Sequence, residues 1–542
     1  MNDDRNKSRG RIRPGVLSTQ PPPVASEARR RWLAQAGALV SSTALPLWVP
    51  AAAAQSASTL NALPRVALII GNTKYIDAPL KNPGNDATAI AGELRKIGFK
   101  VSLQLDAGRA QMAEAIQAFT AELAKTKGVG MFYYAGHGAQ LAWRNYLIPV
   151  DAVIERLEDM RAKTIELNSL LEGITKAKNP MNVIMLDACR DNPFGAKVPT
   201  EQKGLSQFDA PPGSLLAYAT SPGNTAADGE GANGLYTENL LREIIVPEAK
   251  IEDVLKRVRL NVRRKSNGQQ IPWESTSLED DFYFLPPQHI KKLSEAEIER
   301  QFNEELAIWE KIKDSKEPGP FEDYLRNNPS GRFSEMAQFQ LDRALAKLGE
   351  KKIHVEIAKD NPFTKGTAFV NTNFKIGDSW SYREIDLFTK LETRNIVNKI
   401  TDITENEVIF NNGVLVTDLL GNQVKTPDGA RFTQAQIFIQ EYSVGKKWTT
   451  RFRVTRRDGQ SSDVELTFKV VARERITVPA GTFDAYRVER DGWLSQFGVR
   501  NQGVYWIAPG IKRLIANETT HKHSSGKILR ADRTELTSYV QQ

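Results

Sequence analysis

The first 288 residues of the chain contain one cysteine, Cys189, and one histidine, His137, a possible nucleophile and its base. Cys189 ends the apolar run of "NVIMLDACRDNPFG" (182–195), and His137 follows the apolar run of "FYYAGHG" (132–138). A thiol becomes a strong nucleophile when an imidazole accepts its proton or stabilises its thiolate. His137 precedes Cys189 by 52 positions, so the fold has to bring them together for this chemistry. The alternative is a buried, inert thiol at the end of a strand.

Short β-type runs alternate with helical runs between residues 65 and 285. This alternation predicts a mainly parallel sheet with helices on both faces. The carboxyl ends of parallel strands form the ligand crevice of such folds, so we expect positions 137 and 189 to lie there. Strands are expected at 65–72, 100–106, 129–138, 182–188, 214–221 and 281–285, and helices at 85–98, 109–125, 166–178, 236–245 and 251–265.

The motifs "GHG" and "DACRD" resemble those of the caspase family, in which the nucleophile lies in Gln-Ala-Cys-[Arg/Gln/Gly]-Gly and the histidine about 50 residues before it. The resemblance covers residues 65–286 and is closest to bacterial metacaspase-like and paracaspase-like proteins, sometimes called orthocaspases. It implies a caspase-like fold and a cysteine-type endopeptidase, with His137 as the base and Cys189 as the nucleophile. It also implies an oxyanion hole formed by the backbone N–H groups of Gly138 and Cys189. A member of the family without activity would share this pattern.

Three aspartates determine the expected substrate. Asp187 replaces the glutamine that Asp-cleaving caspases carry two residues before the nucleophile, and strand alternation puts it on the same side as Cys189. Asp86, in "NPGNDA", matches a position with which metacaspases and paracaspases line the specificity pocket, although an ordinary helix N-cap is the alternative. Asp228 aligns with a pocket carboxylate of paracaspases, or is a turn residue. Carboxylates attract Arg or Lys and repel acidic side chains, so the predicted polypeptide substrates are cut after Arg or Lys.

The segment 192–213, between the cysteine strand and the next expected strand, is long and polar, as a flexible loop would be. It contains Lys197 and Lys203, which an acidic pocket accepts. We therefore expect the protein to cut itself within this segment.

The first 54 residues have the layout of a bacterial signal peptide. The arginines of "RRRWL" precede a moderately apolar stretch at 32–49 and a small-residue site at 51–54, which resembles a twin-arginine signal. These 54 residues carry eight Lys/Arg and three acids, so they hold most of the net charge of +8. The charge that remains gives no support to a nucleic-acid partner. We expect a periplasmic protein with no membrane span after signal removal, the alternative being a basic arm with an uncleaved anchor.

Two further regions follow the α/β unit. Residues 290–350 are charged and amphipathic, which predicts a helical hairpin linker similar to a single tetratricopeptide-type unit. Residues 370–542 alternate apolar and polar residues between Gly, Asn and Asp turns, which predicts a twisted antiparallel sheet or a partly closed barrel. This β-rich part is similar to domains appended to bacterial envelope proteins, so we expect an envelope protein as its partner.

The sequence requires no cofactor and predicts no metal site. One cysteine allows neither an intramolecular disulfide nor a zinc site with two cysteines, and "HKH" (521–523) is expected to be an exposed turn. Calcium is considered because some metacaspases need it, with the acidic stretch 155–160 as its candidate loop or, alternatively, a solvated face. The alternative function is a non-catalytic, caspase-like scaffold of the cell envelope.

Overall fold

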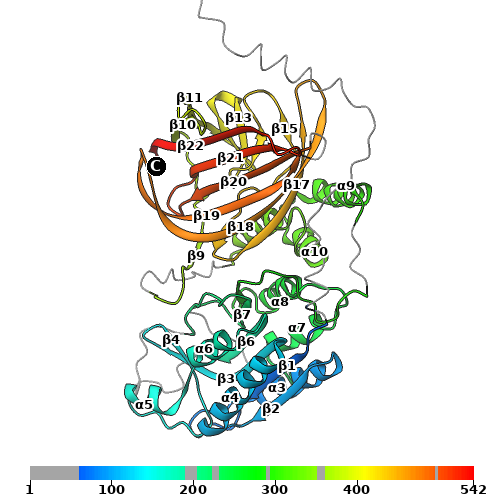
Figure 1. The fold of residues 1–542 in the computed structure, drawn as a ribbon, viewed down its shortest axis with the longest axis vertical. Coiled ribbons are helices and arrows are strands. Elements are labelled where there is room, and N and C mark those ends of the chain that lie inside the picture. Colours follow the sequence, from blue (N-terminus) through cyan, green and yellow to red (C-terminus); the bar gives the residue numbers. More distant parts are fainter. Residues whose placement is uncertain are drawn as a thin grey trace, which may run out of the picture. The chain divides into compact units, whose positions relative to one another are not determined.

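The computed structural model describes residues 60, 62–189, 204–222, 231–288, 293–350, 361–494 and 498–542. They form an α/β unit, a group of helices and a closed β-barrel, in this order along the chain (Figure 1). An α/β unit followed by a β-rich domain is the fold class that the sequence predicts. The predicted signal at 1–54, Asp228, Lys197 and Lys203 lie outside the described residues.

The α/β unit is built on a sheet with the strand order β2-β1-β3-β6-β7-β8. The strands from β2 to β7 are parallel, and the edge strand β8 is antiparallel to β7. The strands are β1 (Arg65–Gly71), β2 (Lys100–Leu105), β3 (Val129–Leu141), β4 (Arg144–Leu147), β5 (Ile165–Glu166), β6 (Met181–Cys189), β7 (Ser214–Tyr218) and β8 (Trp273–Thr276). The helices are α3 (Pro83–Lys96), α4 (Arg109–Thr126), α5 (Leu157–Lys163), α6 (Leu167–Ala177), α7 (Leu235–Glu243) and α8 (Ile251–Lys265).

Successive side chains of each strand point to opposite faces of the sheet, so the apolar core is divided between the two faces. On one face, helices α3, α7 and α8 pack against strand residues such as Ile69 and Met131. On the other face, α4 and α6 pack against residues such as Leu68 and Phe132. Burying one such side chain stabilises the fold by about 1.5–3 kcal/mol, so the apolar runs of β1 and β3 fix both strands in the middle of the sheet.

The last strand of the sheet is not where the sequence predicts it. Residues 281–285 form no strand, and Tyr283 makes only an isolated bridge to Lys250. The apolar run reflects burial instead, because Phe282 and Phe284 belong to the core that α3, α7 and α8 share. The true edge strand is β8, whose sequence "WEST" is too short and too polar to be recognised from alternation.

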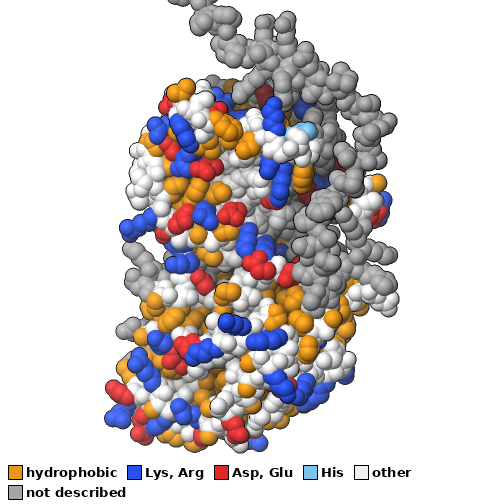
Figure 2. Space-filling model, viewed as in Figure 1, with side chains coloured by type: hydrophobic (Ala, Val, Ile, Leu, Met, Phe, Trp, Pro, Cys, Tyr) orange, Lys and Arg blue, Asp and Glu red, His pale blue; other side chains and the backbone are white. Residues whose placement is uncertain are grey.

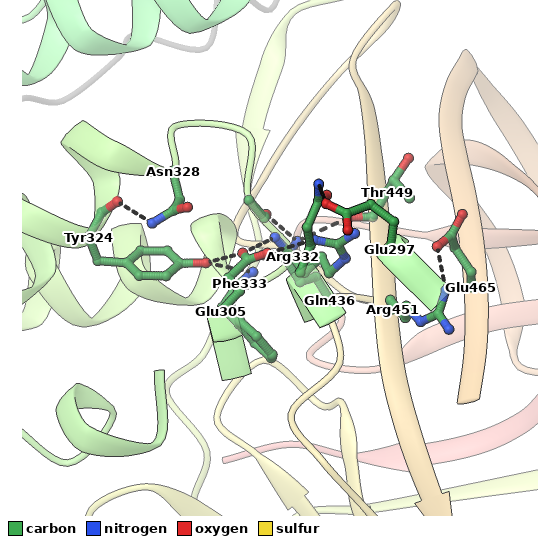
Figure 3. A network of polar contacts seen from close by, with 12 residues as sticks. Glu297, Glu305, Tyr324, Asn328, Arg332, Phe333, Gln436, Thr449, Arg451 and Glu465 are labelled. Atoms are coloured by element: carbon green, nitrogen blue, oxygen red, sulfur yellow. Dashed lines mark hydrogen bonds and ion pairs between the residues drawn. The ribbon is translucent and has the colours of Figure 1, made fainter. Parts of the chain in front are cut away.

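Three helices, α9 (Glu295–Ile312), α10 (Pro318–Asn327) and α11 (Ser334–Lys347), occupy the region of the predicted linker. They share an aromatic core in which Trp309 stacks on Phe333, with ring centres 5.6 Å apart. The turn before α11 surrounds the carboxylate of Glu305, which accepts the Tyr324 hydroxyl at 2.5 Å and the Arg332 guanidinium at 2.9 Å (Figure 3). This buried carboxylate therefore fixes the angle between the helices by hydrogen bonds rather than by packing alone.

Residues 379–540 close into a twelve-stranded antiparallel barrel, in the region where the sequence predicts a twisted sheet or a partly closed barrel (Figure 1). Closure depends on the pairing of β10 with β22, whose residues are more than 140 positions apart. A separate pair joins β9 (Thr367–Phe369) to β16 (Glu441–Ser443). The barrel strands are β10 (Ser379–Asp386), β11 (Glu392–Ile403), β12 (Glu407–Phe410), β13 (Leu415–Asp418), β14 (Gln423–Lys425), β15 (Arg431–Phe432), β17 (Lys447–Thr455), β18 (Ser461–Val478), β19 (Gly481–Leu494), β20 (Val499–Ile507), β21 (Leu514–His523) and β22 (Ile528–Val540).

Charged side chains of both signs are interspersed over the face that Figure 2 shows, and neither sign forms a continuous field there. Among the described residues, no helix has the length and apolar character needed to cross a lipid bilayer.

Asp418, at the end of β13, is a fully buried carboxylate of the barrel domain. It accepts the backbone N–H groups of Leu420 and Asn422, each at 2.9 Å. Burial outweighs these hydrogen bonds and raises the pKa of Asp418 to about 6 from 3.8. The folded state therefore binds a proton that the unfolded state releases between about pH 4 and pH 6.

We expect Asp418 to make the protein less stable as pH rises through this window, because the folded pKa lies above the unfolded one. The loss approaches about 3 kcal/mol by pH 7. The thermal unfolding midpoint, measured from pH 4.5 to 8, should fall more steeply in wild type than in Asp418→Asn. Asp458→Asn, at an exposed hairpin tip, is the control and should follow wild type. Parallel curves for wild type and Asp418→Asn would contradict the prediction.

Candidate active site

The parallel ladder between β3 and β6 pairs His137 with Cys189 and Ala135 with Asp187. The neighbouring strands stop earlier: β1 ends opposite Ala135 and β7 ends opposite Leu186. Positions 137 and 189 therefore lie beyond the parallel core, at the carboxyl edge of the sheet. Neighbouring strands are about 4.8 Å apart, so the backbones at these two positions lie side by side.

Two tyrosines hold the backbone of His137. Its N–H donates to the Tyr75 hydroxyl at 2.8 Å, and its carbonyl accepts the Tyr134 hydroxyl at 2.7 Å. The Tyr75 ring also lies against the imidazole, with ring centres 4.4 Å apart. Gly136 makes this possible: its φ is +154°, and a Cβ there would lie 2.5 Å from the Tyr75 hydroxyl. The glycine before the histidine thus leaves room for the tyrosines that hold it.

One contact determines which nitrogen of His137 is basic. Nε2 lies 2.7 Å from the backbone carbonyl oxygen of Ala78, in the loop after β1. A carbonyl only accepts hydrogen bonds, so Nε2 carries the hydrogen. The neutral ring then has its lone pair on Nδ1, and Nδ1 is the atom able to take a proton.

Gly138 lies where β3 leaves the parallel sheet. Neighbouring residues of a strand direct their backbone N–H and C=O groups to opposite edges of the strand. The N–H of His137 donates to the Tyr75 hydroxyl, and the carbonyl of His137 accepts the Ile148 N–H at 3.1 Å. The N–H of Gly138 therefore faces the other edge, where β6 ends at Cys189. A Cβ at position 138 would lie 3.0 Å from Leu205 and 3.1 Å from the Ala188 methyl, so the space suits glycine.

Asp187 is half-buried and is held by two hydroxyls. Thr237, on α7, donates to its Oδ2 at 2.6 Å, and the Tyr133 hydroxyl lies 3.3 Å from the same oxygen. Tyr133 and Thr237 are themselves 2.6 Å apart. Burial, followed by the charges of Asp187 and Asp86, raises the pKa of Tyr133. The tyrosine therefore stays protonated and remains a donor to this pair.

Asp86 is buried in the first turn of α3 and is not the N-cap, since Asn82 occupies that position. Its Oδ1 accepts the Asn233 side-chain amide at 2.8 Å and the Gly234 N–H at 2.9 Å. A Cβ built on Gly234 would lie 3.2 Å from Oδ2 of Asp86 and 3.7 Å from Oδ2 of Asp187. The two carboxylates thus approach the same point, although 101 positions separate them in the sequence.

Sequence reasoning missed the residues that hold these groups. Tyr75, Tyr133, Thr237 and Asn233 carry no motif of their own, and they reach the site from the loop after β1, from β3 and from the start of α7. The signal that was present is the pair of tyrosines in "FYYAGHG". Because strand residues alternate, Tyr133 faces the carboxylates and Tyr134 faces the histidine backbone.

The acidic stretch 155–160, which the sequence offered as a calcium loop, forms the start of α5. The Asp159 carboxylate accepts the backbone N–H groups of Glu155 and Arg156 at 3.0 and 3.1 Å, so it caps the N-terminus of α5. Within the described ranges, no group of three or more His, Cys, Asp or Glu side chains has an arrangement that could hold a metal ion.

Residues 64–283 match a family model described as the caspase domain. The "mucosa-associated lymphoid tissue lymphoma translocation protein 1 homolog" of Mus musculus and the corresponding protein of Homo sapiens are each 30% identical over 200 residues. The α/β domain belongs to the caspase-like family. The match covers 36% of this chain and 23% of each relative, so the chain spans about a quarter of the curated relatives that it matches. The matched family model is one of peptidase domains.

The packing around Gly138 in the caspase-like domain predicts a stability difference between two glycines. Gly138→Ala should destabilise the protein by about 1–3 kcal/mol, because the new methyl meets Leu205 and Ala188. Gly92→Ala is the matched control: nothing lies within 4 Å of its Cβ position on α3, and it should stabilise by up to about 1 kcal/mol. Thermal unfolding midpoints measure both, and equal shifts for the two variants would contradict the packing argument.

Proposed function

We propose that the protein is an exported cysteine endopeptidase that cuts polypeptides after Arg or Lys, with His137 and Cys189 as its dyad. The observation that carries the proposal is the register of β3 and β6, which pairs these two positions at the carboxyl edge of the sheet. The carboxylate of Asp187 precedes Cys189 by two residues on the same strand, and Asp86 approaches it from α3.

The reaction follows from the groups around the dyad. Nδ1 of His137 takes the proton of the Cys189 thiol, and the thiolate attacks the carbonyl carbon of the scissile bond. The N–H groups of Gly138 and Cys189 bind the oxyanion that forms. The imidazolium then protonates the leaving amine as the C–N bond breaks, leaving a thioester. Water, deprotonated by His137, hydrolyses the thioester and restores the thiol.

The preference for a basic residue rests on two carboxylates, Asp187 and Asp86, that approach the same point. Hydroxyls and amides hold Asp187 and Asp86 in the contacts described above, and these donors orient a carboxylate without cancelling its charge. A guanidinium or ammonium group at the same point gains attraction from both charges in a partly desolvated site. Asp228 is proposed as the third carboxylate of this pocket.

The first test is catalytic. Wild type should release fluorophore from reporters that end in Arg or Lys, and Cys189→Ala should reduce the rate to background. His137→Ala should lower kcat by about 10²–10⁴-fold, because the thiol loses its base. Assays with and without calcium show whether the ion is needed. Absence of turnover under both conditions would exclude the peptidase and leave a non-catalytic scaffold of the envelope.

The same proteins test self-cleavage. Purified wild type should yield two fragments that result from a cut within residues 192–213, after Lys197 or Lys203. Cys189→Ala should stay intact. Lys197→Gln together with Lys203→Gln is the control that keeps the dyad and removes the cut. Equal fragmentation of wild type and Cys189→Ala would attribute the cut to another protease.

The second test addresses specificity. Asp187→Asn keeps the shape of the side chain and removes its charge, so kcat/KM for Arg reporters should fall at least about tenfold. Reporters ending in Gln should lose much less. Asp281→Asn is the control, since Asp281 is a partly exposed carboxylate of the same domain that pairs with Lys250 at 2.7 Å. A uniform fall for Arg and Gln reporters would show that Asp187 acts on catalysis and not on specificity.

Export through residues 1–54 into the periplasm and an envelope partner for the β-barrel complete the proposal. The layout of the basic, apolar and small-residue stretches supports the first, and the similarity to appended envelope domains supports the second.

A further inference from the structure

The segment that leads from the active-site strand toward β7 is buried although it has no regular structure. Leu205, Ser206, Gln207 and Phe208 are each 5% exposed or less, and they lie in neither a helix nor a strand. Irregular backbone normally lies at the surface, because its N–H and C=O groups need partners. The groups that pair with this segment therefore identify what holds it in place.

On its inner side the segment lies against Gly138, whose N–H is proposed to bind the oxyanion. Leu205 packs where a Cβ of Gly138 would lie, 3.0 Å from that position, and shares a core cluster with Ala188. Asn145, on β4, fixes the next residue from both sides: it accepts the Ser206 N–H at 2.7 Å and donates to the Ser206 carbonyl at 2.9 Å. A shift of this segment is thus transmitted directly to Gly138.

On its outer side the segment is covered by residues 361–367, which precede the barrel. Asn361 donates to the Gln207 carbonyl at 2.8 Å, and the N–H of Asp209 donates to the Phe363 carbonyl at 2.9 Å. The Phe363 ring stacks on Phe208 with centres 4.8 Å apart and an angle of 9° between planes. The carboxylate of Asp209 accepts the Thr364 hydroxyl at 2.6 Å and the Lys365 N–H at 2.7 Å.

Residues 361–367 are in turn attached to the β-rich domain. The Tyr486 hydroxyl, on β19, donates to the Gly366 carbonyl at 2.9 Å, and Arg473, on β18, donates to the Lys365 carbonyl at 2.7 Å. The chain then continues as β9, which pairs with β16. Residues 361–367 therefore link the barrel to residues 204–209, and these lie against Gly138.

We propose that residues 361–367 act as a clasp by which the C-terminal β-rich domain positions the peptidase site. The clasp presses residues 204–209 onto Gly138, whose N–H has to stay aimed at the oxyanion. Phe363, Asn361 and Thr364 are positioning residues that act through this segment. The proposal rests on the peptidase function proposed above and adds that the barrel domain is needed for full turnover.

The clasp also fits self-cleavage. A cut after Lys197 or Lys203 leaves residues 204–209 bonded to Asn145 on one side and to residues 361–367 on the other. Residues 204–209 then keep their place beside Gly138 after the cut. Cleavage and an ordered oxyanion region are therefore compatible in this chain.

Variants of the full chain test the clasp. Phe363→Ala should lower kcat for an Arg reporter about tenfold, since a small displacement of a reacting group has effects of this size or larger. KM should change little, because Asp187 and Asp86 lie on other elements. Phe369→Ala is the matched control: Phe369 lies six residues further on β9, is 42% exposed, and should keep wild-type kcat. Phe363→Tyr keeps the stacked ring and should also retain kcat.

A double-mutant cycle separates positioning from general damage. Phe208→Ala and the double variant with Phe363→Ala should each lose about as much kcat as Phe363→Ala alone, because one stack is removed in all three. If Phe363→Ala does not fold, Thr364→Val removes the two hydrogen bonds of the Thr364 hydroxyl, one donated to Asp209 and one accepted from the Gly366 N–H, and should lower kcat by about two- to fivefold. The clasp would be overturned if the fold-loss of kcat in the double variant equalled the product of the two single losses. Equal kcat for Phe363→Ala and Phe369→Ala would also overturn it.

Hydrogen exchange reports the clasp independently of peptide cleavage. Peptides that cover residues 136–140 should exchange faster in Phe363→Ala than in Phe369→Ala or wild type. If wild type cuts no reporter but this difference appears, the clasp stands and the peptidase proposal fails. If wild type is active and the difference is missing, the peptidase proposal stands and the clasp fails.

Discussion

The parallel pairing of β3 with β6 is the constraint on which the proposed chemistry depends. It pairs position 137 with position 189 and position 135 with position 187. A shift of one residue would turn every following side chain to the opposite face of the sheet. The register is protected because both strands are buried on both faces, between α3, α7 and α8 on one side and α4 and α6 on the other. The core thus fixes the geometry of the site at its edge.

The sheet alone does not fix the orientation of the reacting groups, and hydroxyl groups do this at two places. Tyr75 and Tyr134 bind the backbone of His137, while Tyr133 and Thr237 bind the carboxylate of Asp187. Neutral hydroxyls suit both tasks, because they hold a group in place in a partly desolvated site without adding a charge of their own.

The rest of the chain is connected to this domain through polar contacts between segments far apart in sequence. The contact of residues 361–367 with residues 204–209 gives the barrel domain a physical connection to the proposed oxyanion region. The helices join the barrel in the same manner: the N–H of Glu335 donates to the Gln436 side chain at 2.6 Å. A partner that binds the barrel would therefore bind a domain that already contacts the segment beside the proposed oxyanion region.

The sequence by itself determined most elements of the α/β domain and the family that this domain resembles. The apolar runs before His137 and Cys189 are long enough to specify buried strands, and "GHG" with "DACRD" specified the family. It missed β8, because "WEST" has no alternation, and it placed a strand at 281–285, because burial against helices also produces an apolar run. The closure of β10 on β22 and the approach of Asp86 to Asp187 are contacts over more than 100 positions, which no local pattern encodes. Only the tertiary structure decided which nitrogen of His137 is basic, which groups hold the carboxylates of Asp187 and Asp86, and what covers residues 204–209, since each depends on atoms that meet only after the chain has folded.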